Sequence, residues 1–547
     1  MAPFPFRLLC LLLAILGVWL ASHSIYLKIA DPTSSNGSNF YAYTFWRFEP
    51  LSLYTSTAFL LAYCLYRAPL GKGIEYARRL LDSRRLPLVV AFAVLLFTCL
   101  GRFYFHQNFD LCLDESLTEF EAKILQHHHL MAEVPPEWIA FENAMRVSYQ
   151  NYHGTATHGY WASGFLPGFA FIDSFFDSLD LGWATSPVLA TISIFLIAAL
   201  ARRAFPERAS LAAGIAVLLL ACSPQFLMMA MTKFAWTAHL CGTLFWVWLF
   251  THPKRIFFLF TPIVGALLIG LHQPHVHCLI AAPFLLRLIY TFKWKESLWF
   301  GGWYLAGLYA WYHILILLRP TPTGTGGELA NMGFPFLISM VVTSYHAMTL
   351  YAWTTPILIP LCYIGAKTWT KQPPLIQDSV LAALVTFLFY LGFPQMQGHG
   401  WGFRYMQSAY GLMALAATGG AIALTQKYES LLIVRAVVYS VVFSLVLQIP
   451  YRAYEVRTVV RPMSLMWDYL ASRPCDFVIV RTRDVWYSWD LIRNDPWLQQ
   501  KPFIFADERL TPDQKAELAR RGSVIVVGAD DVRRFGVTIL GSARPQP

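Results

Sequence analysis

Long apolar blocks separated by short polar stretches run through most of the chain. Blocks of about 16 to 22 nearly uncharged residues recur between residues 7 and 449. Each block is long enough to cross, as a helix, a hydrocarbon core that is about 30 Å thick. Because backbone amides inside a bilayer must bond within their own segment, the pattern predicts helices rather than strands. We therefore expect a mainly α polytopic membrane protein with about 13 transmembrane helices.

The basic residues indicate which side of the membrane each loop faces. The chain is 56% hydrophobic and 14% charged, with a formal net charge of +10. Lysine and arginine gather in short loops between apolar blocks, most clearly at residues 67–85, as the positive-inside rule expects of cytoplasmic loops. The charge therefore reports topology, and we expect no nucleic-acid partner. This distribution of loop charges predicts that the N-terminus lies inside and the C-terminus outside. It also predicts that residues 87–102 form a span that runs outward.

The last part of the chain has a soluble composition and predicts a small α/β domain. Short β-rich runs occupy residues 475–482, 501–508 and 523–530, and residues 511–522 have the Thr start and Gly stop of a helix. No Gly-rich phosphate loop accompanies them, so nucleotide binding is not expected here. We divide the chain into two N-terminal helices with a basic loop (1–86), a transmembrane core with a large external loop at 103–182 (87–450), and an external α/β domain (451–547).

The positions of the nine cysteines point to no metal or redox site. Most lie in apolar blocks, where cysteine behaves as a small hydrophobic residue, and no CxxC motif suggests a zinc or redox site. Cys112 and Cys475 are in polar surroundings and could pair in an oxidising compartment, which the sequence leaves open.

The segment from Arg102 to Gly164 is the longest polar interval before the C-terminal tail, and it holds the first candidates for chemistry. Asp114 and Glu115 lie roughly ten residues beyond an expected membrane helix. An acidic pair just outside a membrane helix is costly unless it is solvated or used. His127, His128 and His129 follow, but consecutive helical residues point about 100° apart and cannot converge on one metal.

Several motifs then occur in a familiar order. They are Asp114-Glu115 after an outward helix, the aromatic Gly/Pro segment Tyr160 to Gly168, a span ending in Arg202-Arg203, a span reaching Ser223-Pro224, and a late Gly402-Phe403-Arg404-Tyr405. Over roughly residues 87–450 this order resembles the GT-C superfamily of polytopic glycosyltransferases, in the branch with bacterial protein mannosyltransferases and lipid A aminoarabinose transferases. The resemblance implies a GT-C-like bundle that takes a sugar from a polyprenyl-phosphate donor on the outer face.

The resemblance also implies roles for particular residues. An inverting transfer needs a carboxylate base, for which Asp114 or Glu115 is available and the family likeness favours Asp114. Cationic and polar donors must receive the charge that develops on the lipid phosphate. The candidates for that role are Arg404, His399, Lys233 and Tyr405. The candidates for the substrate groove are His158, Tyr160, Trp161, His272, His275 and His277.

A metal is not assigned. Some relatives use a divalent ion, but no Asp-x-Asp occurs in the second external loop. A role for Mg, Mn or Zn therefore stays open, and no other cofactor is expected.

Two other functions stay open beside glycosyl transfer. A secondary transporter or lipid flippase would explain the many spans, although we find no internal repeat. A polysaccharide ligase or polymerase would use a similar lipid-linked donor. In each case the partners are membrane lipid and a polyprenyl carrier, with an unknown protein, lipid or glycan acceptor. The compact loops favour a bacterial inner membrane with the active site on the periplasmic side.

Overall fold

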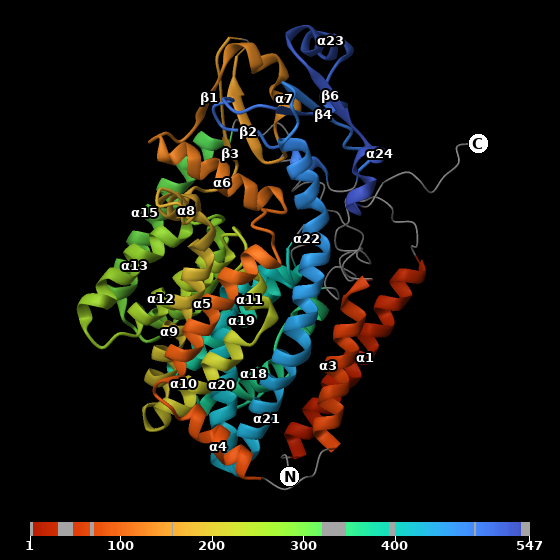
Figure 1. Cartoon of the computed structure of the whole chain (residues 1–547). Helices are drawn as coiled ribbons and strands as arrows, with labels where there is room; N and C mark the ends of the chain where they lie inside the picture. The colour runs from red at the N-terminus through yellow and green to blue at the C-terminus, as the bar shows by residue number, and fades with distance from the viewer. Residues whose placement is uncertain are drawn as a thin grey trace.

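The protein is built mainly of helices, as the apolar blocks predict. The computed structural model describes residues 4–30, 47–65, 71–155, 157–319, 346–392, 400–485 and 488–537. Figure 1 shows the long helices side by side in one part of the molecule and most of the strands gathered at the opposite end. The helices of this body are α1 (Phe4–Ala30), α3 (Glu49–Leu65), α4 (Lys72–Leu81), α5 (Leu86–Tyr104), α9 (Thr185–Ala204), α10 (Ala209–Ala221), α11 (Pro224–Met229), α12 (Trp236–Phe250), α13 (Arg255–Ile269), α14 (Pro274–Tyr290), α15 (Trp294–Leu318), α18 (Leu358–Lys367), α19 (Pro374–Gly392), α20 (Tyr410–Lys427), α21 (Ser430–Phe443) and α22 (Ile449–Ala471).

The length and composition of several helices suit a membrane. Within the described ranges, five helices are long and apolar enough to cross one: Leu86–Tyr104, Gly182–Ala204, Pro374–Leu391, Arg404–Lys427 and Ser430–Ala471. Shorter apolar helices cover Arg7–Ser22, Arg255–Ile269, Pro274–Tyr290 and Leu358–Lys367. The expected multi-pass character fits these helices, and the count of about 13 spans stays a prediction.

The last long helix does not end where the composition becomes polar. We expected soluble structure from Tyr451, but α21, a π-helical turn at Ser444–Gln448 and α22 form one continuous helix to Ala471. Helix α22 buries Val456, Val460 and Met463, at helical spacing, against the rest of the protein. This apolar stripe maintains the helix through a stretch that is polar on its other faces.

The large external loop is more ordered than its sequence suggested. It contains α6 (Leu113–Gln126), β1 (Ala132–Val134), α7 (Glu142–Met145), β2 (Gln150–Gly154), β3 (Gly159–Ser163) and α8 (Gly168–Asp177). The three strands form an antiparallel sheet in the order β1-β3-β2, here called the outer sheet, which we did not predict. Helix α8 exposes Phe171 and Phe175 while it buries Phe169 and Asp173. An exposed aromatic face of this kind suits a helix that lies at a membrane interface.

The C-terminal strands and helix lie where the sequence predicted them. Strands β4 (Phe477–Val480), β5 (Phe503–Ala506) and β6 (Val524–Val527) form a parallel sheet in the order β5-β4-β6, and α23 (Pro512–Arg521) precedes β6. Thr511 caps α23 through a capping box with Gln514. The ring of Trp138 packs against Phe503, with centroids 4.9 Å apart, and so joins this sheet to the external loop.

The N-terminal helical pair is held to the body by a buried ion cluster. The guanidinium of Arg452 on α22 lies 2.6 Å from a carboxylate oxygen of Glu49 on α3 and 2.6 Å from one of Glu455. All three side chains are almost fully buried, and the guanidinium carbon lies 4.2 Å from the ring centroid of Trp353. Removing one member of such a cluster leaves an uncompensated buried charge.

Replacing Arg452 with methionine should therefore destabilise the protein. We expect the free energy of unfolding in detergent micelles to fall by roughly 3–5 kcal/mol, because Glu49 and Glu455 would remain buried without their cation. The exposed Arg461, nine residues further along α22, serves as the control, and Arg461→Met should change little. Equal losses in both variants would show that the cluster does not hold the helical pair.

Candidate functional site

The structure brings Asp114 and Arg404 together across 290 residues of sequence. Asp114 lies in the first turn of α6, and Arg404 begins the 3₁₀ turn η5 (Arg404–Ala409) that leads into α20. The Nη1 atom of Arg404 donates to Oδ2 of Asp114 at 2.6 Å. The Arg404 side chain is 7% exposed and that of Asp114 is 16% exposed, so water screens this ion pair only weakly.

The backbone before Arg404 is shaped by a glycine. Gly402 has φ +61°, a left-handed conformation, and a Cβ atom there would lie 1.9 Å from Oε1 of Gln225. The backbone N–H of Gln225 donates in turn to the Trp353 carbonyl at 3.1 Å. Only glycine allows the loop to lie this close to Gln225 and Trp353, and this approach directs the next residues toward α6.

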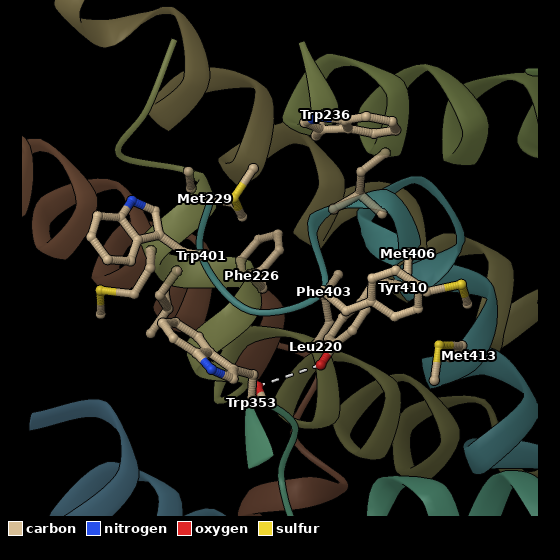
Figure 2. Close-up of a cluster of buried hydrophobic side chains, with 14 of the residues drawn as sticks. Leu220, Phe226, Met229, Trp236, Trp353, Trp401, Phe403, Met406, Tyr410 and Met413 are labelled. Atoms are coloured by element: carbon tan, nitrogen blue, oxygen red, sulfur yellow. Dashed lines mark hydrogen bonds between the residues drawn. The ribbon is translucent and has the colours of Figure 1, made fainter. Parts of the chain in front are cut away.

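An aromatic core supports the same loop. Figure 2 shows Trp353, Trp401, Phe403 and Tyr410 grouped with the methionines around them. The Tyr410 hydroxyl donates to the Trp353 carbonyl at 3.4 Å, the bond drawn as a dashed line in Figure 2. Since Trp401 and Phe403 are buried on both sides of Gly402, the position of Arg404 is fixed by packing.

Aromatic rings also surround the guanidinium itself. Its central carbon lies 4.8 Å from the ring centroid of Phe234 and 5.5 Å from that of Tyr405. Tyr405 stacks on Tyr390 at 4.7 Å, and the ring of Trp236 lies 5.2 Å from that of Tyr405. These rings hold the cation by cation–π contacts and keep the surroundings low in dielectric.

Glu115, the second acidic candidate, is turned away from Arg404. Its Oε2 accepts a hydrogen bond from the Leu111 N–H at 3.1 Å, and its Oε1 accepts one from the Lys233 N–H at 3.2 Å. Burial raises the pKa of Glu115 to about 7, the Asp110 charge adds to the rise, and Arg102 opposes it. Both oxygens of Glu115 therefore tie the start of α6 to neighbouring backbone, and Asp114 alone of the two meets the cation.

Lys233 belongs to a different charge cluster from Arg404. Its ammonium lies 3.4 Å from Asp173 and 3.8 Å from Glu119. Burial would lower the pKa of Lys233, but the carboxylates of Glu119, Asp110 and Asp173 outweigh burial and raise that pKa. No local pattern in the sequence indicated that these carboxylates gather around Lys233, because Asp173 lies on α8 while Asp110 and Glu119 lie before and within α6. The residue that reaches Arg404 is the next one in the chain, Phe234.

Two of the groove histidines lie beside the aromatic rings of the site. The His272 ring lies 4.2 Å from the ring of Phe165, and the charges of Asp114 and Arg404 both act on it. Burial lowers the pKa of His272 to about 4, so the ring is neutral at pH 7. His275 contacts the Tyr390 hydroxyl at 3.1 Å.

The remaining predicted residues lie elsewhere. His277 is buried and contacts the Tyr304 hydroxyl at 2.7 Å, which makes it a packing residue between α14 and α15. His158 and Tyr160 are exposed at the hairpin of β2 and β3. Trp161 is completely buried and donates to the Pro496 carbonyl at 2.8 Å, so it supports the outer sheet and offers a substrate no surface. His399 lies outside the described residues.

The parts of the chain that the structure describes contain no group of three His, Cys, Asp or Glu side chains that could hold a metal ion. All nine cysteines are described and free, so Cys112 and Cys475 do not pair. The candidate base Asp114 is paired with the Arg404 guanidinium and not with a second carboxylate.

Glu121 anchors α6 to the outer sheet. Its side chain is buried, and its Oε2 accepts a hydrogen bond from the Ser163 N–H of β3 at 3.0 Å. Burial raises the pKa of Glu121 to about 8, and the bond from Ser163 opposes the rise. The folded protein therefore keeps a proton here that the unfolded chain loses near its ordinary value of 4.5.

Comparisons with known proteins find only distant likenesses. No protein-family model matches the chain, and no curated protein does. Among solved structures, ArnT from Cupriavidus metallidurans bound to undecaprenyl phosphate is 13% identical, with 77% of this chain and 86% of that chain covered and a TM-score of 0.48. The apo state of the same protein is 12% identical, with 81% of this chain and 87% of that chain covered and a TM-score of 0.43. The oligosaccharyltransferase of Archaeoglobus fulgidus in the apo form is 12% identical, with 79% of this chain and 65% of that chain covered and a TM-score of 0.45.

Glu121→Gln should change how stability depends on pH. Because the folded state holds the Glu121 proton up to about pH 8, stability from this group is present at low pH and is lost as pH rises from about 4.5 to about 8. Glutamine keeps an oxygen for the Ser163 N–H and does not titrate. We expect the thermal midpoint of the native chain to fall more between pH 5 and pH 8 than that of the variant, as followed in detergent micelles.

The exposed Glu133 of β1 gives the matched control, because Glu133→Gln should keep the native slope. Parallel pH profiles for the native chain and Glu121→Gln would contradict a protonated Glu121.

Proposed function

We propose that the chain is a glycosyltransferase that moves a sugar from a polyprenyl-phosphate donor to a hydroxyl or amine on the outer face of the membrane. The observation that carries this proposal is the shielded pair of Asp114 and Arg404 at 2.6 Å. A carboxylate and a guanidinium in contact are the two groups that such a transfer needs at its reacting bond.

In the proposed reaction, Asp114 accepts the proton of the acceptor hydroxyl or amine. The acceptor atom forms a bond to the anomeric carbon of the sugar from the side opposite the lipid phosphate. The bond between that carbon and the phosphate oxygen breaks, and its electron pair stays on the phosphate. The configuration of the sugar is inverted, and the proton ends on Asp114.

Arg404 stabilises the charge of the leaving phosphate. A guanidinium offers two parallel N–H groups to a phosphate, and such charge-assisted bonds strengthen in a low-dielectric site. In the unloaded protein Asp114 occupies this guanidinium. A donor phosphate would compete with Asp114 for Arg404 and so free the carboxylate to take a proton.

The neighbouring groups suit the same reaction. The neutral ring of His272 can exchange hydrogen bonds with sugar hydroxyls without adding charge. The hydroxyl of Tyr405 is the second candidate for the phosphate, because its ring adjoins Arg404. Lys233 is engaged by carboxylates, so the phosphate role is proposed for Arg404 with Tyr405, and for His399 on the sequence alone.

The proposal includes a location. The apolar helices suit a multi-pass membrane protein, and the charges of the loops favour an outer position for α6 and the C-terminal sheet. We propose the inner membrane of a bacterium with the site facing the periplasm. A polysaccharide ligase would keep the same donor chemistry and differ only in its acceptor.

Asp114→Asn should abolish transfer while the protein still folds. Asparagine keeps the shape of the side chain and cannot accept the proton, so we expect the rate to fall by at least about 100-fold. The measurement is turnover of polyprenyl-phosphate-linked sugars by the chain in proteoliposomes. Glu133→Gln, an exposed acid of the same external loop, should keep the native rate. A native rate in Asp114→Asn would remove Asp114 as the base.

A further inference from the structure

A cavity lies near the site and is separate from the Asp114 and Arg404 pair. It has a volume of about 630 Å³, within the range of roughly 300–1,000 Å³ that ligand pockets occupy. Its wall comes from α6, from the outer end of α22 and from the loop before β5 in the C-terminal sheet. Asp114 and Arg404 are not part of that wall as the described residues define it. Figure 1 shows α22 running from the helical body to the end where α6 and the strands lie.

The charges around this cavity mostly neutralise each other. Arg102 pairs with Asp110 at 2.7 Å, and Lys123 pairs with Glu119 at 2.9 Å. A nucleotide or another strongly anionic ligand would require an excess of cations, which this wall does not offer. A lipid tail would require an apolar wall, and here charged and amide side chains predominate. The wall therefore suits a neutral ligand that both donates and accepts hydrogen bonds.

The other wall residues add the features that sugars need. Asp180 and Asp468 reach the cavity, and neither carboxylate is in an ion pair with a described residue. A carboxylate accepts hydrogen bonds from two neighbouring hydroxyls at once. The indole rings of Trp183 and Trp467 also line the cavity, and flat rings of this kind pack on the C–H face of a sugar.

We infer that this cavity is a carbohydrate-binding site, distinct from the reacting centre. The inference does not require that the chain transfers a sugar. It does connect the two places, because the side chain of Lys233 lines the cavity while Phe234, the next residue, packs against the Arg404 guanidinium. A glycan in the cavity would thus lie one residue of the chain from the contacts that hold Arg404.

Ligand-observed NMR with the full chain tests the site. The protein is kept in lauryldimethylamine oxide, since detergents with sugar headgroups would compete. The probes are chitotriose and maltotriose, with inorganic phosphate as the anionic comparison. We expect saturation transfer from the protein to the ring protons of at least one trisaccharide, and no competition by phosphate.

Ser464→Trp assigns the binding to this cavity. Ser464 is a buried residue of α22 in the cavity wall, so an indole there would fill the space and abolish saturation transfer. Thr458→Trp, on the same helix and outside the wall, is the matched control and should bind as the native chain does. Should Ser464→Trp not fold, the exposed Asp468→Ala replaces it, with an expected weakening of roughly tenfold.

Three results would overturn the inference. The first is no saturation transfer from the native chain to either sugar. The second is undiminished transfer in Ser464→Trp, or in Asp468→Ala where Ser464→Trp does not fold. The third is displacement of the sugar by phosphate. None of these results depends on measuring transferase activity, so the inference and the proposed function can fail separately.

Discussion

Arg404 can stay buried beneath the external loop because Asp114 faces it at 2.6 Å. An ion taken out of water costs several kcal/mol unless a close partner offsets the loss of hydration. The same constraint acts at Arg102 with Asp110 and at Arg452 with Glu49. In the Arg404 pair, the Asp114 side chain is the partner that a donor phosphate would replace under the proposed function. A phosphate in that position would keep the cation satisfied and release the carboxylate to take a proton.

Helix α6 acts as the platform for Asp114, and it is fixed along its whole length. Glu115 bonds to backbone N–H groups at the start of the helix, and Glu121 bonds to Ser163 of the outer sheet in the middle. Near the end, Gln126 donates to Asp177 on α8 at 2.8 Å. Arg404 is fixed from the other side by Gly402 and the aromatic core below it. Two rigid supports therefore define the short distance between acid and cation.

The sequence predicted the parts that local pattern determines. Apolar length predicted the helical body, and β-rich runs between turn residues predicted β4, β5, β6 and the capped helix α23. Asp114 was a candidate because it lies in a polar interval beside an apolar block, and Arg404 was one because the GT-C resemblance implied a cation for the lipid phosphate. The rest depends on contacts between distant segments. Strands β1 to β3 carry mixed polar and aromatic residues without clear alternation, and α22 continues only because its apolar stripe finds a partner. The carboxylates around Lys233 and the burial of Trp161 against Pro496 likewise follow from packing that no local pattern records.

The central claim is that a lipid-linked phosphate takes the place of Asp114 at Arg404. Its most direct test is the affinity of the full chain for a polyprenyl phosphate, measured for the native protein, Arg404→Gln and Arg404→Lys, together with a structure of the native complex. The account predicts a phosphate in contact with the Arg404 guanidinium and a separated Asp114. It also predicts affinity that falls roughly tenfold or more in Arg404→Gln and is partly restored in Arg404→Lys. Equal affinity in all three proteins, or a phosphate bound far from an intact Asp114 and Arg404 pair, would contradict it.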